Sequence, residues 1–224
     1  MTRNLKTLGL ALVAAFVMSA TMAAAAQADP FWIKSDGTPT TVLGGSAGEE
    51  AFAFDAGIVN CDEVFYHGSF AGTTVTTLTL TPEFRGECEF AGKSAVIDLN
   101  GCSYVFHTHT KKEVTKFTVT TTLSCPAGNE LTITTIGVGG TLKCTEHIPP
   151  QTIATGITFT NATEGIKHIE VDINITTGLT YTQKAGTGAG ACANGNDTAN
   201  GQYVGNVDIA GGNTLGEATN LWVE

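Results

Sequence analysis

His107 and His109 are the two residues of this sequence whose type and spacing most directly suggest chemistry. Residues two apart on a β-strand project from the same face, so these two imidazoles could hold one Zn²⁺ ion. Tyr104 and Phe106 are expected to form the apolar face of the same strand, so the two histidines point outward. Glu113 is the one nearby acidic residue that could serve as a further ligand. A zinc site needs at least three protein ligands. We therefore expect two solvated surface histidines and no metal or other cofactor.

Two further patterns match the letters of catalytic motifs. Residues 44–48 read Gly-Gly-Ser-Ala-Gly, as in a nucleophile elbow, but that motif needs a strand before the serine and a helix after it in an α/β sheet. No such setting is predicted, so we interpret this stretch as a linker. Glu83, Glu87 and Glu89 cluster near a turn, and paired carboxylates hydrolyse glycosides when they flank a groove. On so acidic a chain, solvated surface charge is the simpler interpretation.

Two other groups suggest ligand binding. Asn194, Asn196, Asp197 and Asn200 form an oxygen-rich stretch that could hold Ca²⁺, but calcium loops usually offer several carboxylates and this one offers one. We interpret it as a polar loop. The aromatic residues that could stack on sugar rings in an exposed row are Trp32, Trp222, Tyr181 and Tyr203, although aromatic side chains on strands more often face a core.

The elements that must position these residues are predicted to be strands. Phe117, Val119, Thr121 and Leu123 alternate with hydroxylated residues, and the odd-numbered residues from Ile169 to Ile175 alternate with polar ones. About one residue in six after position 28 is threonine, which favours half-buried strands. Gly-rich and Asn-Gly turns separate the strands, and no helical period occurs after residue 30. The sequence predicts an all-β, antiparallel β-sandwich.

The N-terminus has the pattern of a secretory signal. Arg3 and Lys6 precede an apolar run at 8–18, and small residues follow up to Ala28, after which we expect cleavage. The run is too short to span a bilayer, and no second long apolar stretch occurs, so we expect no membrane insertion. The remaining chain carries a formal charge of −12, because the leader removes two cations from the total of −10. With so few clustered Lys and Arg, nucleic acid is excluded as a partner.

Short matched stretches predict a duplication within residues 52–212. Residues 78–81 match 157–160, and 101–104 match 178–181, with gaps between them. The units would be about 52–137 and 138–212, sharing one core because each is marginal alone. Ile97 and Ile173 should then both face inward. Residues 1–28 are the signal peptide, 29–51 a leader with an edge strand, and 213–224 a C-terminal segment.

Six cysteines in an exported chain indicate three disulfides, since Cys-x-x-Cys pairs typical of thiolate metal sites are absent. The duplication aligns four cysteines in pairs but leaves Cys88 and Cys102 without counterparts, and this joint absence predicts a Cys88–Cys102 disulfide. The remaining cysteines allow two pairings: Cys61–Cys125 with Cys144–Cys192, which we favour, or Cys125–Cys144 with Cys61–Cys192.

The turn and cysteine signatures at 100–104, 125–128, 149–151 and 200–205 resemble those of a group of exported, threonine-rich, six-cysteine all-β bacterial proteins to which no activity is assigned. This resemblance implies a fold and a compartment. We therefore expect a non-enzymatic module of the extracellular space or cell envelope, with a glycan or an envelope component as partner. The alternative is a carbohydrate-binding protein or glycoside hydrolase, which would show a concave surface with exposed aromatic side chains beside carboxylates.

Overall fold

The computed structural model describes residues 31–37, 41–69, 71–113, 115–136, 142–185, 198–213 and 215–224. Every regular element in these ranges is a β-strand, and all strand pairs are antiparallel. The all-β prediction is thereby confirmed. The expected signal peptide, residues 1–28, lies outside the described residues, as do residues 194–197 of the polar loop.

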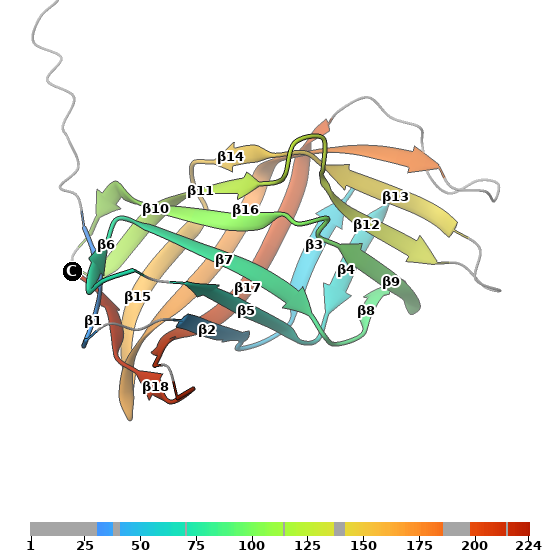
Figure 1. Ribbon diagram of the computed structural model, residues 1–224. Coiled ribbons are helices and arrows are strands. Elements are labelled where there is room, and N and C mark those ends of the chain that lie inside the picture. Colours follow the sequence, from blue (N-terminus) through green and yellow to red (C-terminus); the bar gives the residue numbers. More distant parts are fainter. Residues whose placement is uncertain are drawn as a thin grey trace, which may run out of the picture.

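The described residues run back and forth as eight extended segments, each hydrogen-bonded to the next along the sequence (Figure 1). Most segments are interrupted part-way, so that one segment contains two or three strands. In order, the segments are β2 and β3 (Thr41–Ser46, Glu50–Phe54), β4 and β5 (Gly57–Cys61, Val64–Ser69), β7 and β8 (Thr77–Phe84, Cys88–Phe90), β9 and β10 (Lys93–Asp98, Ser103–Lys112), β11 and β12 (Lys116–Ser124, Leu131–Ile136), β13 to β15 (Leu142–Ile148, Gln151–Ile153, Ile157–Glu164), β16 (Ile166–Ala185) and β17 (Thr198–Gly212).

The last segment pairs with the first, so the sheet closes on itself. β17 is paired with β16 along one side and with both β2 and β3 along the other. Closure gives hydrogen-bond partners to backbone groups that would otherwise stand at a sheet edge. A two-sheet sandwich is therefore not confirmed, because one continuous sheet surrounds the core. The predicted leader, residues 29–51, also differs from the structure: β2 is no edge strand, since it is paired with β5 and β17.

A small three-stranded sheet covers one end of the closed sheet. It consists of β1 (Ile33–Ser35) between β6 (Thr74–Val75) and β19 (Leu221–Val223). β18 (Ala218–Thr219) pairs with the end of β17 nearby. The Phe31 ring lies 4.9 Å from that of Phe117, so the small sheet joins the main core. β1, β6 and the C-terminus lie together at the left of Figure 1.

The predicted alternation of inward and outward residues is confirmed in β11 and β16. Phe117, Val119, Thr121 and Leu123 are all buried, and so are the odd-numbered residues from Ile169 to Ile175. Their neighbours along each strand are half-buried or exposed. Ile97 packs against the core and Ile173 is buried, so both face inward as expected. The interior is thus mostly apolar along these two strands.

The disulfides differ from the predicted pairs. Cys61 is bonded to Cys88, with 4.1 Å between their Cα atoms, and Cys102 to Cys125, with 4.0 Å. Each disulfide links two neighbouring segments at a point where their strands end or begin. The predicted Cys88–Cys102 bond is wrong, because each of these cysteines is bonded to another partner.

The predicted bonds Cys61–Cys125, Cys125–Cys144 and Cys61–Cys192 are wrong as well, since Cys61 and Cys125 have other partners. The favoured Cys144–Cys192 bond stays a prediction. Cys144 is disulfide-bonded, and Cys192 lies outside the described residues. The duplication is not confirmed either. Residues 78–125 contain the strands from β7 to β11, whereas the matched stretch from 157 onward contains β15 and β16. The matched stretches of sequence therefore lie in strands that have different places in the sheet.

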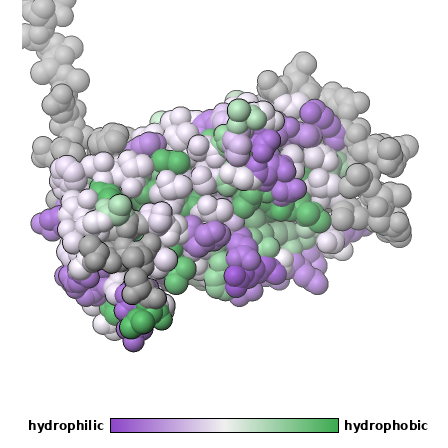
Figure 2. Space-filling model, in the orientation of Figure 1, coloured by the Kyte–Doolittle hydropathy of each residue, from purple (hydrophilic) through white to green (hydrophobic). Residues whose placement is uncertain are grey.

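The outer surface carries most of the described threonines and charged residues. Figure 2 shows a face of mostly intermediate hydropathy, with hydrophilic clusters and smaller hydrophobic areas between them. Large apolar side chains that are exposed include Leu43, Ile58, Val96 and Val204. Within the described ranges, no helix is long and apolar enough to cross a membrane.

Candidate functional site

The two histidines that the sequence singles out lie on β10, and the structure describes the side chain of one of them. His107 is half-buried and faces outward, as expected, with its Nε2 atom 3.4 Å from the Thr122 hydroxyl. The side chain of His109 lies outside the described residues. Within the described part of the chain, the residues that come together with metal-ligand spacing are others, on β16 and β17.

The suspected catalytic motifs have structural roles. Ser46 ends β2, and its hydroxyl accepts a hydrogen bond from the Val64 backbone amide at 3.0 Å. The chain continues into strand β3 and not into a helix, so residues 44–48 form no nucleophile elbow. Glu83 is paired with Arg85, whose NH2 group donates a hydrogen bond to it at 2.7 Å. This bond lowers the pKa of Glu83 and keeps the carboxylate ionised.

The four aromatic residues that could stack on sugar rings are divided between the core and the surface. Tyr181 and Tyr203 are buried in the core. Trp222 is covered by Lys167, whose Nζ atom lies 4.7 Å from the ring centroid. Asn200, the described member of the polar loop, donates a hydrogen bond to Asp55 at 2.6 Å. Of the four aromatic candidates, Trp32 is the exposed one, at 41%.

A groove of about 690 Å³ crosses the outside of β2, β5 and the end of β7. Gly45 forms its floor, and the half-buried ring of Phe65 lies directly across the ladder from it. The Arg85 guanidinium is stacked 4.6 Å from the centroid of the Phe65 ring, and Glu83 is the cross-strand neighbour of Phe65. In Figure 2 a hydrophilic cluster lies over the end of β7, next to a hydrophobic area. We call this hollow the Gly45 groove.

The Gly44–Gly45 pair is a sequence signal for this groove. Two consecutive glycines in a strand mark a place where something approaches the backbone closely. Gly44 faces inward, where a Cβ atom would lie 2.6 Å from the Ile209 side chain. Gly45 faces outward, and a Cβ atom there would lie 4.0 Å from the nearest atom of Phe65. One glycine is thus required by packing, whereas the other leaves open space beside an aromatic ring.

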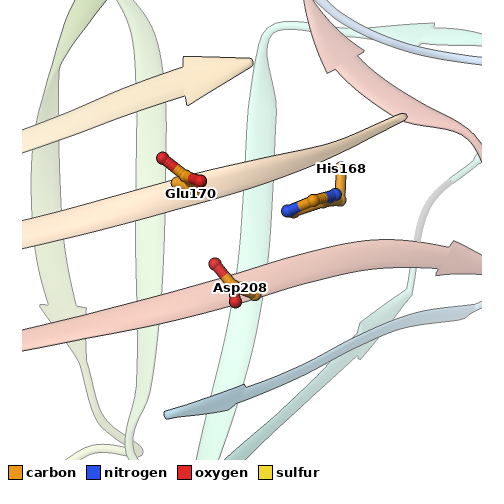
Figure 3. A group of neighbouring side chains, drawn as sticks. All are labelled: His168, Glu170 and Asp208. Atoms are coloured by element: carbon orange, nitrogen blue, oxygen red, sulfur yellow. The ribbon is translucent and has the colours of Figure 1, made fainter. Parts of the chain in front are cut away.

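A second group of outward-facing side chains lies on β17, the strand next to β2, and on β16 beyond it. His168 and Glu170 project from β16, and Asp208 projects from β17 directly opposite Glu170. Figure 3 shows the three side chains turned toward the same space in front of the two strands. One ligand atom of each lies within 4.8 Å of those of the others. Asp208 is also the cross-strand neighbour of Gly45, so this group adjoins the Gly45 groove.

A buried carboxylate lies at the centre of the closed sheet. Glu50 on β3 is fully buried and accepts hydrogen bonds from the hydroxyls of Tyr66, at 2.8 Å, and Tyr203. The two hydroxyls are 2.7 Å apart. Burial raises the pKa of Glu50 to about 7, although both tyrosine hydrogen bonds oppose the shift. Burial and the Glu50 carboxylate raise the pKa values of both tyrosines.

The interior beside this cluster has no room for an organic ligand. A cavity of about 10 Å³ is lined by three tyrosines, by Phe106, by Thr121 and by isoleucine side chains. That volume holds about one water molecule. The Thr121 hydroxyl is buried there without a protein partner. The surfaces of this region that could bind a larger molecule are therefore on the outside of the sheet.

No family model, no curated protein and no solved structure matches the chain.

Proposed function

We propose that this chain is an exported, non-enzymatic module that binds its partner at the Gly45 groove, in the extracellular space or the cell envelope. The observation that carries the proposal is the groove itself, with a glycine floor, an aromatic wall and an Arg85–Glu83 ion pair at its rim. Support for export comes from the signal pattern of residues 1–28 and from the disulfides, which persist in oxidising compartments.

A specific observation favours carbohydrate as the partner. Sugar rings stack an apolar face on aromatic side chains and present hydroxyls to charged groups. The Gly45 groove combines Phe65 with Glu83, Arg85 and His67. Glu83 is the one carboxylate among the groove's described lining residues, whereas glycoside hydrolysis uses two. The arrangement therefore favours glycan binding over glycan hydrolysis.

A glycan array probed with the oxidised, exported protein tests this proposal. Phe65→Ala removes the stacking surface, and Gly45→Thr fills the floor with a residue typical of the rest of the outer face. We expect both variants to lose about tenfold or more in affinity for any glycan that the unmodified protein binds. Ile58→Ala, which removes an exposed apolar side chain from β4, is the matched control and should bind normally.

Two results would overturn parts of the proposal. Absence of binding to any glycan would exclude carbohydrate, and binding that survives both groove substitutions would exclude the Gly45 groove. Export has a separate readout, because the intact mass of the exported protein should correspond to a chain beginning near Asp29. A mass that includes residues 1–28 would contradict cleavage.

A further inference from the structure

We propose that His168, Glu170 and Asp208 bind one divalent transition-metal cation, with Zn²⁺ as the best-fitting ion. This inference is independent of glycan binding, because it rests on different side chains. The three ligand atoms lie within 4.8 Å of one another (Figure 3). Small rotations of the three side chains would bring these atoms to the bonding distance of about 2.0–2.2 Å around a single Zn²⁺ ion.

The strand geometry brings the three side chains together. His168 and Glu170 are two apart on β16 and therefore project from the same face. Asp208 pairs with Glu170 in the β16–β17 ladder, and directly opposed residues carry their side chains side by side. Both strands are paired on either side at this level, so the backbone that carries the ligands is fixed.

The His168 ring is held in the orientation and tautomer that a metal ligand needs. Its Nδ1 atom lies 3.3 Å from the Ile166 carbonyl oxygen, which can only accept a hydrogen bond. Nδ1 therefore carries the proton in the neutral ring, and Nε2 keeps its lone pair. Metal-binding histidines commonly donate their second ring N–H to a backbone carbonyl in this way.

The two carboxylates are opposed without a cation of the protein between them. Like charges directly opposite each other destabilise a strand pair. Within the described residues, neither Glu170 nor Asp208 forms a salt bridge or a side-chain hydrogen bond. A bound divalent cation would supply the missing positive charge.

The donor set selects among cations. One imidazole nitrogen and two carboxylate oxygens are ligands of tetrahedral Zn²⁺, with a fourth position left for water or a partner. Ca²⁺ requires six to eight oxygen ligands, and Mg²⁺ prefers oxygen alone in octahedral geometry. The site therefore discriminates against both of these ions through His168.

Isothermal titration of the oxidised protein, purified without a polyhistidine tag, tests the proposal. We expect Zn²⁺ binding to saturate at one ion per chain, with Ca²⁺ and Mg²⁺ binding at least about tenfold more weakly. His168→Ala, Glu170→Gln and Asp208→Asn should each weaken Zn²⁺ binding by about tenfold or more. His107→Ala and Asp62→Asn are the matched controls, since each alters an outward-facing or exposed side chain of the same type away from β16 and β17.

Thermal unfolding gives a second readout, because the difference in melting temperature between the variants and the unmodified protein should change sign when Zn²⁺ is added. In a chelator, Glu170→Gln and Asp208→Asn should raise the melting temperature, because they remove the charge repulsion. With added Zn²⁺ the unmodified protein should gain stability and these two variants should not. Zn²⁺ binding that is absent, or that is lost in His107→Ala and kept in His168→Ala, would overturn the proposal.

Discussion

The Tyr203 hydroxyl donates a hydrogen bond to Glu50 from a position 153 residues later in the chain. The two residues lie on β17 and β3, which pair where the sheet closes, and both are buried. A carboxyl group is costly to bury in its charged form, even with two hydroxyl donors. The closure of the sheet therefore contains an ionisable group whose charge state affects stability.

Stability should fall as the pH rises through the titration of Glu50. Its pKa is raised to about 7 in the folded protein from 4.5, so between these values the folded state holds a proton that the unfolded chain releases. The free energy of unfolding then decreases with rising pH across this window and levels off above it. The loss is on the order of 3 kcal/mol. Urea unfolding at several pH values across the window measures it.

Glu50→Gln isolates this contribution. The amide is neutral at every pH, so the variant should match the unmodified protein at the acidic end of the window and exceed it in stability at the alkaline end. Glu49→Gln changes the neighbouring exposed carboxylate and serves as the control. Parallel pH profiles for Glu50→Gln and the unmodified protein would contradict the assignment.

Gly205→Ala should destabilise the protein by about 1 to 3 kcal/mol, as is typical of overpacked cores. A Cβ atom at this position would lie 2.7 Å from Cγ of Glu50, inside the crowded centre of the sheet. Gly48→Ala is the control, because a Cβ atom there meets nothing within 4 Å. Equal urea midpoints for the two variants would argue against close packing around Glu50.

Removal of Cys61 and Cys88 together should cost about 3 to 4 kcal/mol on the chain-entropy model for a separation of 27 residues. The double alanine variant should also leave the Cys102–Cys125 bond intact and release no thiol. Titration with a thiol reagent after denaturation checks this point. Two reactive thiols per chain would instead support the pairs that the duplication suggested.

Much of the fold was predictable because period-two alternation is a local property. Phe117, Val119 and Leu123 show which face of β11 is buried without reference to any other strand. Alternation does not show which strands are neighbours. The closure of β17 onto β2 depends on pairings between residues far apart in the sequence.

The candidate sites were harder to predict for the same reason. His168, Glu170 and Asp208 come from two strands, and only the register of the β16–β17 ladder brings Asp208 opposite Glu170. His107 and His109 were conspicuous because they are near neighbours in the sequence. Glu50 was overlooked because its segment was interpreted as a leader, although Glu50, Phe52 and Phe54 keep the period of a strand with one inward face.

Closure of the sheet has a consequence for how the protein folds. β2 has its second partner only when residues 207–212 are available, so the ring cannot be completed before nearly the whole chain is present. Contacts between such distant residues form slowly, because chain entropy must be lost before they contribute. The two disulfides join neighbouring segments and can form earlier. Until β17 arrives, β2 and β16 are open strand edges that other chains can pair with, so folding yield should fall as protein concentration rises.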